Sequence, residues 1–252
     1  MLKISKISLK QGDCLDLLRD VESHSVDMVL ADLPYGTTKN KWDSVIDLNK
    51  LWEQYERIIK EHGVIALFGD EPFASELRIS NKKLYRYDWI WIKSNPTGFL
   101  NANRMPLKNT ETISIFYKKL PLYNPQMTGG KPYNVHNNGL SKNYGKYTTN
   151  YSTDNHGTRY PLKTIRFNGV INNGEKRFHP TQKPIALLEY LIRTYTDPKM
   201  TVLDNVMGSG STGVACANLN RSFIGMEKDK KYFDIANERI NSAKSQADNS
   251  LF

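Results

Sequence analysis

The sequence predicts an α/β fold, built on a doubly wound, largely parallel sheet with one antiparallel edge strand and an inserted irregular region. Two observations lead to this prediction. Short apolar runs such as Val26–Ala31 have the continuous character of strands buried on both faces, and they alternate with segments of helical periodicity. That alternation stops near residue 118 and resumes near residue 179, and a chain of 252 residues still buries a sizeable core.

The first 117 residues read as strands and helices in turn. The helix expected over Asp47–Lys60 has apolar side chains at helical spacing and is followed by Gly63. Two later strands, Tyr87–Lys93 and Thr112–Lys118, are expected to pair as neighbours at a sheet edge. The other expected elements of this half are strands at Ile4–Leu9, Val26–Ala31 and Val64–Phe68 and helices at Cys14–Val21 and Glu71–Ser80.

The last 74 residues, 179–252, return to the same alternation after a different middle. Residues 118–178 are rich in Asn, Gly and Tyr and show no sustained period, so we expect loops with short strands inserted into the sheet framework. We therefore divide the chain at 1–117, 118–178 and 179–252. The elements expected in the last part are helices at Ile185–Tyr195, Thr212–Leu219 and Lys231–Ala247 and strands at Thr201–Asp204 and Ser222–Glu227.

The positive charge is concentrated in one segment. The whole chain has a net charge of +9, yet residues 118–178 alone hold ten Lys and Arg against two acidic residues. We call residues 118–178 the basic segment. A polyanion such as nucleic acid is the partner that this distribution favours, and a solvated basic loop is the alternative. The candidate contacts to nucleic acid are Lys131, Lys142, Lys146, Arg159, Lys163 and Arg166.

Other classes of protein are excluded or disfavoured by composition. No run of about 18 apolar residues exists, which excludes a transmembrane helix. Two cysteines, Cys14 and Cys216, build neither a disulfide framework nor a zinc site made of cysteine alone, so we expect a reducing, cytoplasmic location. No metal is expected, because the histidines other than His179 show no ligand spacing: His24, His62, His136 and His156.

A glycine loop lies between a strand and a helix at residues 201–213, which read TVLDNVMGSGSTG. Gly208, Gly210 and Gly213 match the G-x-G-x-x-G spacing of nucleotide-binding loops. Glu227 follows Gly208 by 19 residues, at the end of the next strand, where a carboxylate can bind ribose hydroxyls. Together these features predict a cofactor that contains a nucleoside.

The charge of the loop distinguishes between cofactors. Asp204 ends the strand just before the glycines, and a buried carboxylate there would repel the pyrophosphate of a dinucleotide. The same carboxylate suits the ammonium end of S-adenosylmethionine. The loop also lacks the Lys of a Walker-type phosphate cradle. We therefore expect S-adenosylmethionine.

A second strand end carries polar chemistry. Residues 27–36 read DMVLADLPYG, a buried strand followed by an acid, a proline and an aromatic residue. In open α/β sheets, ligands bind outside the carboxyl ends of the strands, and both this segment and the glycine loop stand at such ends. An ordinary turn capped by Asp32 is the alternative interpretation for this segment when it is taken alone.

With these two motifs, the sequence resembles the amino-methylating DNA methyltransferases of the β class, which act on adenine N6 or cytosine N4. DLPYG resembles their D-P-P-Y catalytic motif and LDNVMGSGSTG their D-P-F-x-G-S-G-T-T cofactor motif. The order of motifs, catalytic first, target recognition next and cofactor last, is also similar. Further segments that look familial are QGDCLDLL (11–18), the WIWIK to IFYK stretch (89–118), HPTQKP (179–184) and GMEK (225–228).

The resemblance implies a Rossmann-like methyltransferase that methylates the N6 amino group of an adenine flipped out of double-stranded DNA. Asp32 and the Leu33 carbonyl would accept the hydrogens of that amino group, Pro34 would fix the backbone, and Tyr35 would stack on the base. Leu33, Asn205 and Val206 depart from the family motifs, and the Asp of DLPYG favours adenine. The residues expected to bind the cofactor are Asp13, Thr181, Lys183, Asp204, Met207, Gly208, Ser209, Gly210, Ser211, Thr212, Glu227 and Lys228.

Several of these roles are specific. Asp204 and the glycine loop would hold the methionine part of the cofactor, Glu227 the ribose and Asp13 the adenine amino group. Thr181 and Lys183 would reach the cofactor carboxylate, with a solvated surface lysine as the alternative for Lys183. His179 is expected to be structural.

Alternative functions stay open at this stage. A nicotinamide or flavin oxidoreductase would use the glycine loop but leave DLPYG and the basic segment without a role. A nucleic-acid-binding module without catalysis would not need Asp32, Tyr35 and Asp204 together. Within the family, cytosine-N4 methylation and RNA adenine methylation also remain. The recognition sequence, a homodimer, a cognate restriction nuclease and a host or phage origin are not readable from the residues.

Overall fold

The computed structural model describes residues 5–36, 45–137, 151–170 and 174–249. In these residues one eight-stranded sheet has the order β1-β12-β11-β2-β3-β5-β4-β10. Seven of the strands run in the same direction and β5 runs antiparallel to its neighbours, with β4 and β10 beyond it at that end of the sheet. The bounds are β1 Ile7–Gln11, β2 Val26–Ala31, β3 Ile59–Gly69, β4 Tyr85–Thr97, β5 Lys108–Phe116, β10 Thr164–Phe167, β11 Thr201–Asp204 and β12 Ser222–Glu227.

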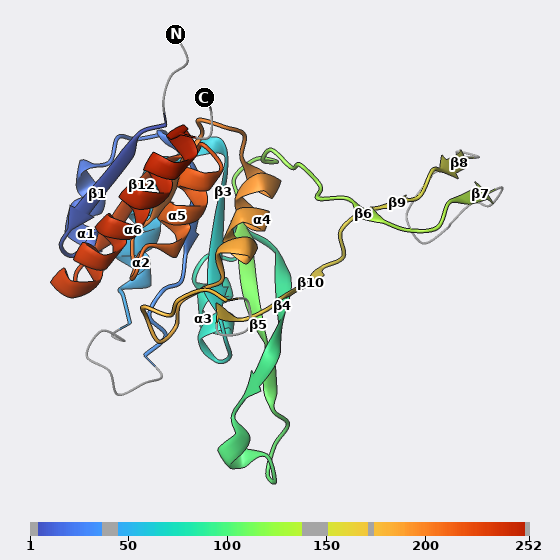
Figure 1. The fold of residues 1–252 in the computed structure, drawn as a ribbon, viewed down its shortest axis with the longest axis horizontal. Helices are drawn as coiled ribbons and strands as arrows, with labels where there is room; N and C mark the ends of the chain where they lie inside the picture. The colour runs from blue at the N-terminus through green and yellow to red at the C-terminus, as the bar shows by residue number, and fades with distance from the viewer. Residues whose placement is uncertain (1–4, 37–44, 138–150, 171–173, 250–252) are drawn as a thin grey trace. The chain divides into compact units, whose positions relative to one another are not determined.

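Helices cover both faces of the sheet (Figure 1). One face carries α1 (Cys14–Leu17), α2 (Leu48–Ile58) and α3 (Phe73–Ser80), and the other carries α4 (Ile185–Tyr195), α5 (Ser211–Asn218) and α6 (Lys230–Asn249). Each face has its own buried cluster. Alternate residues of β2 enter different clusters, Met28 and Leu30 on the α4–α6 side and Val29 and Ala31 on the other. The doubly wound α/β fold predicted from the sequence is thus confirmed.

Several element boundaries differ from the predicted ones, and two helices show how. The helix expected to reach Lys60 ends at Ile58, because Ile59 begins β3 and pairs with Val26 of β2. The pattern of apolar residues is compatible with both structures there, and strand pairing decides between them. The helix expected over Cys14–Val21 is shorter too: α1 ends at Leu17, and a 3₁₀ turn covers Leu18–Asp20.

Residues Pro125–Leu162 form a separate compact unit. Two short antiparallel pairs build it, β6 (Thr128–Gly129) with β9 (Thr158–Arg159) and β7 (Tyr133–Asn137) with β8 (Tyr151–Asn155). The Arg159 guanidinium lies 4.5 Å from the centroid of the Tyr133 ring and donates to Asn155 Oδ1 at 2.7 Å. This unit lies inside the basic segment, whereas β10, also in that segment, belongs to the large sheet.

The sheet has its switch point between β2 and β11. These two parallel strands are neighbours, and the chain leaves them toward opposite ends of the sheet, from β2 to β3 and from β11 to β12. A ligand site is expected at the carboxyl ends of such strands. Among the described residues, no helix is both long and apolar enough to cross a membrane.

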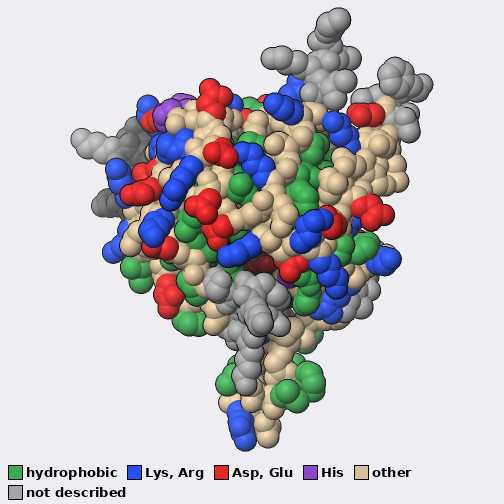
Figure 2. Space-filling model, turned by 90° about the vertical axis from the view of Figure 1, so that its left-hand side faces the viewer, with side chains coloured by type: hydrophobic (Ala, Val, Ile, Leu, Met, Phe, Trp, Pro, Cys, Tyr) green, Lys and Arg blue, Asp and Glu red, His purple; other side chains and the backbone are tan. Residues whose placement is uncertain are grey.

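Charged side chains of both signs are interspersed over the face of the molecule shown in Figure 2. This matches the sequence, in which residues 1–117 and 179–252 together contribute a net charge of only +1. The unit that contains the large sheet also includes six basic residues and one acidic residue of the basic segment, so its net charge is +6 and the separate unit holds the remaining +3.

Candidate active site

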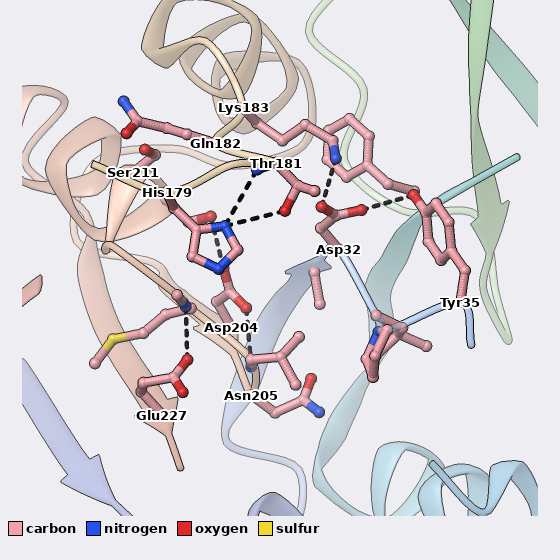
Figure 3. A pocket seen from close by; sticks show the side chains of 18 of the residues that line it. Asp32, Tyr35, His179, Thr181, Gln182, Lys183, Asp204, Asn205, Ser211 and Glu227 are labelled. Atoms are coloured by element: carbon pink, nitrogen blue, oxygen red, sulfur yellow. Dashed lines mark hydrogen bonds and ion pairs between the residues drawn. The ribbon is translucent and has the colours of Figure 1, made fainter. Parts of the chain in front are cut away.

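A cavity of about 1000 Å³ opens at the carboxyl ends of the central strands. Asp32 follows β2, Asp204 ends β11 and Glu227 ends β12, so the sheet brings three carboxylates to one edge. All of them line the cavity, together with Asp13 after β1. Figure 3 shows the side chains of this site.

Tyr35 and Asp32 form one side of the cavity. Tyr35 Oη donates to Asp32 Oδ1 at 2.7 Å and also to Glu111 Oε1 at 3.3 Å, and the tyrosine ring stacks on Phe73 with centroids 5.0 Å apart. Leu33 is 2% exposed and packs in the core on the α1–α3 side. Its larger side chain, where the family motif has proline, is therefore accommodated in the core.

A cluster of two carboxylates and two lysines lies behind Tyr35, and we call it the carboxylate–lysine cluster. Lys183 Nζ pairs with Asp32 Oδ2, and it also lies 3.0 Å from Glu111 Oε1. The other oxygen of Glu111, Oε2, lies 2.7 Å from Lys93 Nζ. Glu111 is 7% exposed, so the cluster is largely shielded from water.

The charges in this cluster shift one another's pKa values. Burial works against the ammonium of Lys183, but the Asp32 and Glu111 carboxylates raise its pKa above the ordinary value. Burial would also raise the pKa of Glu111, yet the two lysines hold it below the ordinary value. Burial raises the pKa of Asp32, with Lys183 opposing that rise and Glu111 adding to it.

Asp204 occupies the opposite side of the cavity. Its carboxylate accepts from Thr212 Oγ1 at 2.7 Å and from the backbone N–H of Val206 at 3.1 Å. It is 4% exposed, and burial raises its pKa to about 7. In the described part of the chain it has no cationic partner, and the ionised groups that act on it, Asp32 and Glu227, are both anions.

The glycine loop curls around this carboxylate because glycines adopt left-handed backbone angles. Gly208 has φ +51° and Gly210 has φ +81°, conformations that other residues rarely adopt. The Gly208 N–H donates to Glu227 Oε2 at 2.9 Å. A Cβ on Gly210 would lie 2.8 Å from Ala236 Cβ, so α6 packs directly against the loop.

Asp13 and Lys228 close the end of the cavity near β1. Asp13 caps α1 by accepting from the Leu15 N–H at 3.0 Å, and its other oxygen lies 3.0 Å from Lys228 Nζ. The hydrogen bond from Lys228 lowers the pKa of Asp13, so this group stays ionised. Glu227 has both oxygens engaged by backbone N–H groups of Gly208 and Asp229, which leaves further lone pairs for a ligand.

The segment before α4 passes over the cavity. His179 Nδ1 lies 3.1 Å from Thr181 Oγ1, and the imidazole packs edge-on against Tyr232. Burial lowers the pKa of His179 to about 4, so the ring is neutral at pH 7. These contacts agree with a structural role for His179.

Asn205 and Val206 stand where the family motif has proline and phenylalanine. Asn205 is buried, and its Oδ1 accepts a hydrogen bond from Tyr55 Oη at 2.5 Å. Val206 is half-buried and packs against the α1–α3 side of the core. Both residues also line the cavity, so these departures from the family motif form part of its wall.

The structure brings the residues singled out at the two strand ends together. Of the catalytic and cofactor residues expected from the sequence, all except Gly210 line the cavity. Lys183, expected near the cofactor carboxylate, instead has its ammonium between Asp32 and Glu111. Of the expected nucleic-acid contacts, Lys131 and Arg159 lie in the separate unit. Lys163 directly precedes β10 and Arg166 lies within it. Lys142 and Lys146 lie outside the described residues.

Sequence reasoning did not single out Glu111 and Lys93. A charged residue next to an apolar strand was the available signal, since Lys93 follows WIWI and Glu111 precedes TISIF. Such a charge usually marks a solvated strand end. In the structure both residues lie within their strands, where β4 pairs with β5 and Trp91 stands opposite Glu111, and both line the cavity.

The cavity fits a cofactor with a cation at one end and a nucleoside at the other. Asp204 is a buried anion without a cationic partner in the described residues, which suits an ammonium group and would repel a pyrophosphate. Glu227 and Asp13 add acceptors at the far end. This set of carboxylate acceptors matches S-adenosylmethionine.

Known proteins resemble the chain over most of its length. The family model described as DNA methylase (N6_N4_Mtase) matches residues 26–238. The type II methyltransferase M1.MboII of Moraxella bovis is 28% identical over 260 residues, which is 96% of this chain and 98% of that protein. The type II methyltransferase M.HpaI of Haemophilus parainfluenzae is 26% identical over 241 residues, 92% of this chain and 73% of that protein.

Solved structures show the same likeness. The M1.HpyAVI–SAM complex superposes with a TM-score of 0.64 at 27% identity, covering 93% of this chain and 99% of that one. The PvuII DNA methyltransferase, described as cytosine-N4-specific, has a TM-score of 0.66 at 16% identity and covers 97% and 93%. At that lower identity the likeness concerns the fold alone.

Proposed function

The chain belongs to the N6/N4 family of S-adenosylmethionine-dependent DNA methyltransferases, and we propose that it methylates the N6 amino group of an adenine flipped out of double-stranded DNA. The observation that carries this proposal is the pairing of Asp32 with Tyr35 in the cavity, opposite the buried Asp204. An acceptor for an amino group, an aromatic ring for a base and an anion for a cofactor ammonium face one space.

The cofactor would lie along the β11–β12 side. When bound, it supplies a methyl group that is electrophilic because it is attached to a sulfonium. Asp204 would hold the ammonium and Glu227 the ribose hydroxyls, with Asp13 and Lys228 at the adenine. The backbone of the glycine loop, Met207 to Thr212, and the Thr181 hydroxyl would surround the methionine part. In this proposal Lys183 acts on the Asp32 side, because its ammonium already bridges two carboxylates there.

The target amino group is a poor nucleophile, since its lone pair is delocalised into the ring. Asp32 would accept one of its hydrogens and the Leu33 carbonyl the other, which turns the lone pair toward the methyl group. Asp32 is also the nearest acceptor for the proton that the methylated amine must lose. Pro34 limits the backbone angles between these groups.

Tyr35 would hold the flipped base by stacking. One face of its ring lies against Phe73, and its hydroxyl is tied to Asp32 and Glu111, so the ring orientation is set before the base arrives. The other face would then stack on the base, a contact worth about 1–3 kcal/mol. Flipping costs a few kcal/mol, which contacts from the basic segment to DNA phosphates would offset.

The cytosine N4 amino group is the second candidate substrate, because the same acceptors would serve it. Asp at position 32 favours adenine, since the resemblance associates Ser at this position more often with cytosine. RNA adenine is a third. We propose to incubate the purified chain with methyl-labelled cofactor and unmethylated DNA or RNA and to identify the labelled nucleoside after digestion. N6-methyladenine from DNA is the expected product, and label in N4-methylcytosine would transfer the assignment to cytosine.

A further inference from the structure

Both oxygens of the Asp32 carboxylate are already occupied in the structure. Oδ1 accepts the Tyr35 hydroxyl at 2.7 Å and Oδ2 pairs with the Lys183 ammonium (Figure 3). An incoming amino group needs an acceptor on this same carboxylate. A strong ionic donor such as Lys183 competes with a neutral amine for that oxygen. Each oxygen keeps a second lone pair, but an oxygen that already binds an ammonium is a weaker acceptor, so the amino group binds best when the ammonium moves away.

Glu111 offers the ammonium a second anionic partner. Lys183 Nζ is 3.0 Å from Glu111 Oε1, so a small movement would keep the ammonium paired while it leaves Asp32. Lys93 holds the other oxygen of Glu111 at 2.7 Å, and Tyr35 Oη lies 3.3 Å from Oε1. Because Glu111 is fixed from two sides and is 7% exposed, it is a preformed acceptor and not a side chain that must be ordered first.

We propose that Glu111 is a positioning residue of the site, which takes over the Lys183 ammonium when the target amino group replaces it on Asp32. The proposal rests on the function given above and concerns the same cavity. It assigns Lys183 to the control of Asp32, and it explains why a buried glutamate stands on the antiparallel strand β5 beside the catalytic loop. The net charge of the four-residue cluster is zero, so the exchange leaves no unbalanced charge buried.

Substituting Glu111 or Lys183 by glutamine removes a negative or a positive charge next to Asp32, so the two variants should shift its pKa in opposite directions. The ionisable groups that face Asp32 are Tyr35 on its own loop, Lys183 before α4, Glu111 on β5 and Asp204 on β11. Glu111 raises the pKa of Asp32 and Lys183 lowers it. In the pH profile of kcat, Glu111→Gln should therefore move the acidic limb to lower pH, and Lys183→Gln should move it to higher pH.

The rate at a pH well above that limb tests the exchange itself. In Glu111→Gln the ammonium keeps only Asp32 as an ionic partner, so kcat should fall about 10- to 100-fold. The double variant Glu111→Gln/Lys183→Gln removes the competing ammonium as well and should be faster than Glu111→Gln alone. Binding of S-adenosylhomocysteine and the melting temperature report on folding in every variant. Glu61→Gln, which removes a surface carboxylate paired with Lys119, is the matched control and should behave as wild type.

The results that would refute the role of Glu111 differ from those that would refute adenine methylation. A double variant no faster than Glu111→Gln, or limbs that do not move in opposite directions, would overturn the proposal. If Glu111→Gln does not fold, two other measurements decide. The acidic limb of Lys183→Gln should still move to higher pH. Glu111→Asp, which keeps the charge, should retain a kcat above about 10% of wild type. Wild-type product in cytosine would refute the adenine assignment but leave this comparison valid, since either amine needs the Asp32 acceptor.

Discussion

Lys183 and Asp32 form an ion pair in the cavity although 151 residues separate them in the chain. Asp32 comes from the end of β2, and Lys183 comes from the segment just before α4. The pair joins the DLPYG loop after β2 to the HPTQKP segment (179–184) before α4. The two halves thus complete one site across the switch point of the sheet.

Tyr35 should contribute to activity mainly through its ring. Tyr35→Phe keeps the stack on Phe73 and loses only the hydrogen bonds to Asp32 and Glu111, so we expect a loss of about 3- to 10-fold in kcat/KM. Tyr35→Ala also loses the stacking on the base and should cost roughly 10- to 100-fold more. Steady-state kinetics on DNA containing the recognition sequence measure both, and an alanine variant as active as the phenylalanine variant would refute the stacking role.

Asp204 should determine cofactor affinity. Asp204→Asn keeps the size of the side chain but removes the charge that would bind the ammonium, so affinity should fall about 10- to 100-fold. Because burial raises the pKa of Asp204 to about 7, wild-type affinity should also rise between pH 6 and pH 8. Calorimetry with S-adenosylmethionine across this range measures both effects. Equal affinity of the variant and wild type at pH 8 would exclude the assignment.

The same carboxylate should destabilise the cofactor-free protein at alkaline pH. Its pKa is about 7 in the folded state and 3.8 in an ordinary environment, so the folded state binds the extra proton in between. The stability that Asp204 contributes is therefore complete below about pH 4 and lost as the pH rises toward 7. Asp204→Asn should melt several degrees above wild type at pH 8, with the difference shrinking toward pH 5. A constant difference would contradict the raised pKa.

DNA affinity should depend steeply on salt through the basic segment. If about five of its charges meet phosphates, log affinity falls against log salt with a slope near −4 to −5. Lys131→Ala combined with Lys163→Ala should lower the magnitude of that slope by about 2. Lys10→Ala, which removes a lysine paired with Asp20 in the framework, is the control and should leave it unchanged. If the double variant has the wild-type slope, these two lysines do not contact phosphates and are solvated charges.

Much of this site was predictable because residues at the ends of predicted strands can be placed at one edge of the sheet. Asp32, Asp204 and Glu227 each follow a short apolar run of the kind that forms a buried strand, and parallel strands bring their carboxyl ends to one edge. The glycine loop was equally readable, since Gly208 and Gly210 need backbone angles that other residues avoid.

What could not be predicted depends on pairing and side-chain reach. Glu111 and Lys93 reach the cavity because β5 runs antiparallel between β3 and β4, an arrangement that local patterns do not encode. Lys183 was assigned to the cofactor from its motif, yet a long flexible side chain can choose between anions on either side. Ile59 began a strand where helical spacing continued, since its pairing with Val26 is a tertiary contact.

The most direct test is modified-base sequencing of DNA from cells that express the chain, with Asp32→Ala as the matched control. We predict N6-methyladenine at one short recurring sequence for wild type. The Asp32→Ala variant should leave that sequence unmodified while the purified protein still binds S-adenosylmethionine. N4-methylcytosine in place of N6-methyladenine, or modification that persists in the Asp32→Ala cells, would contradict the account.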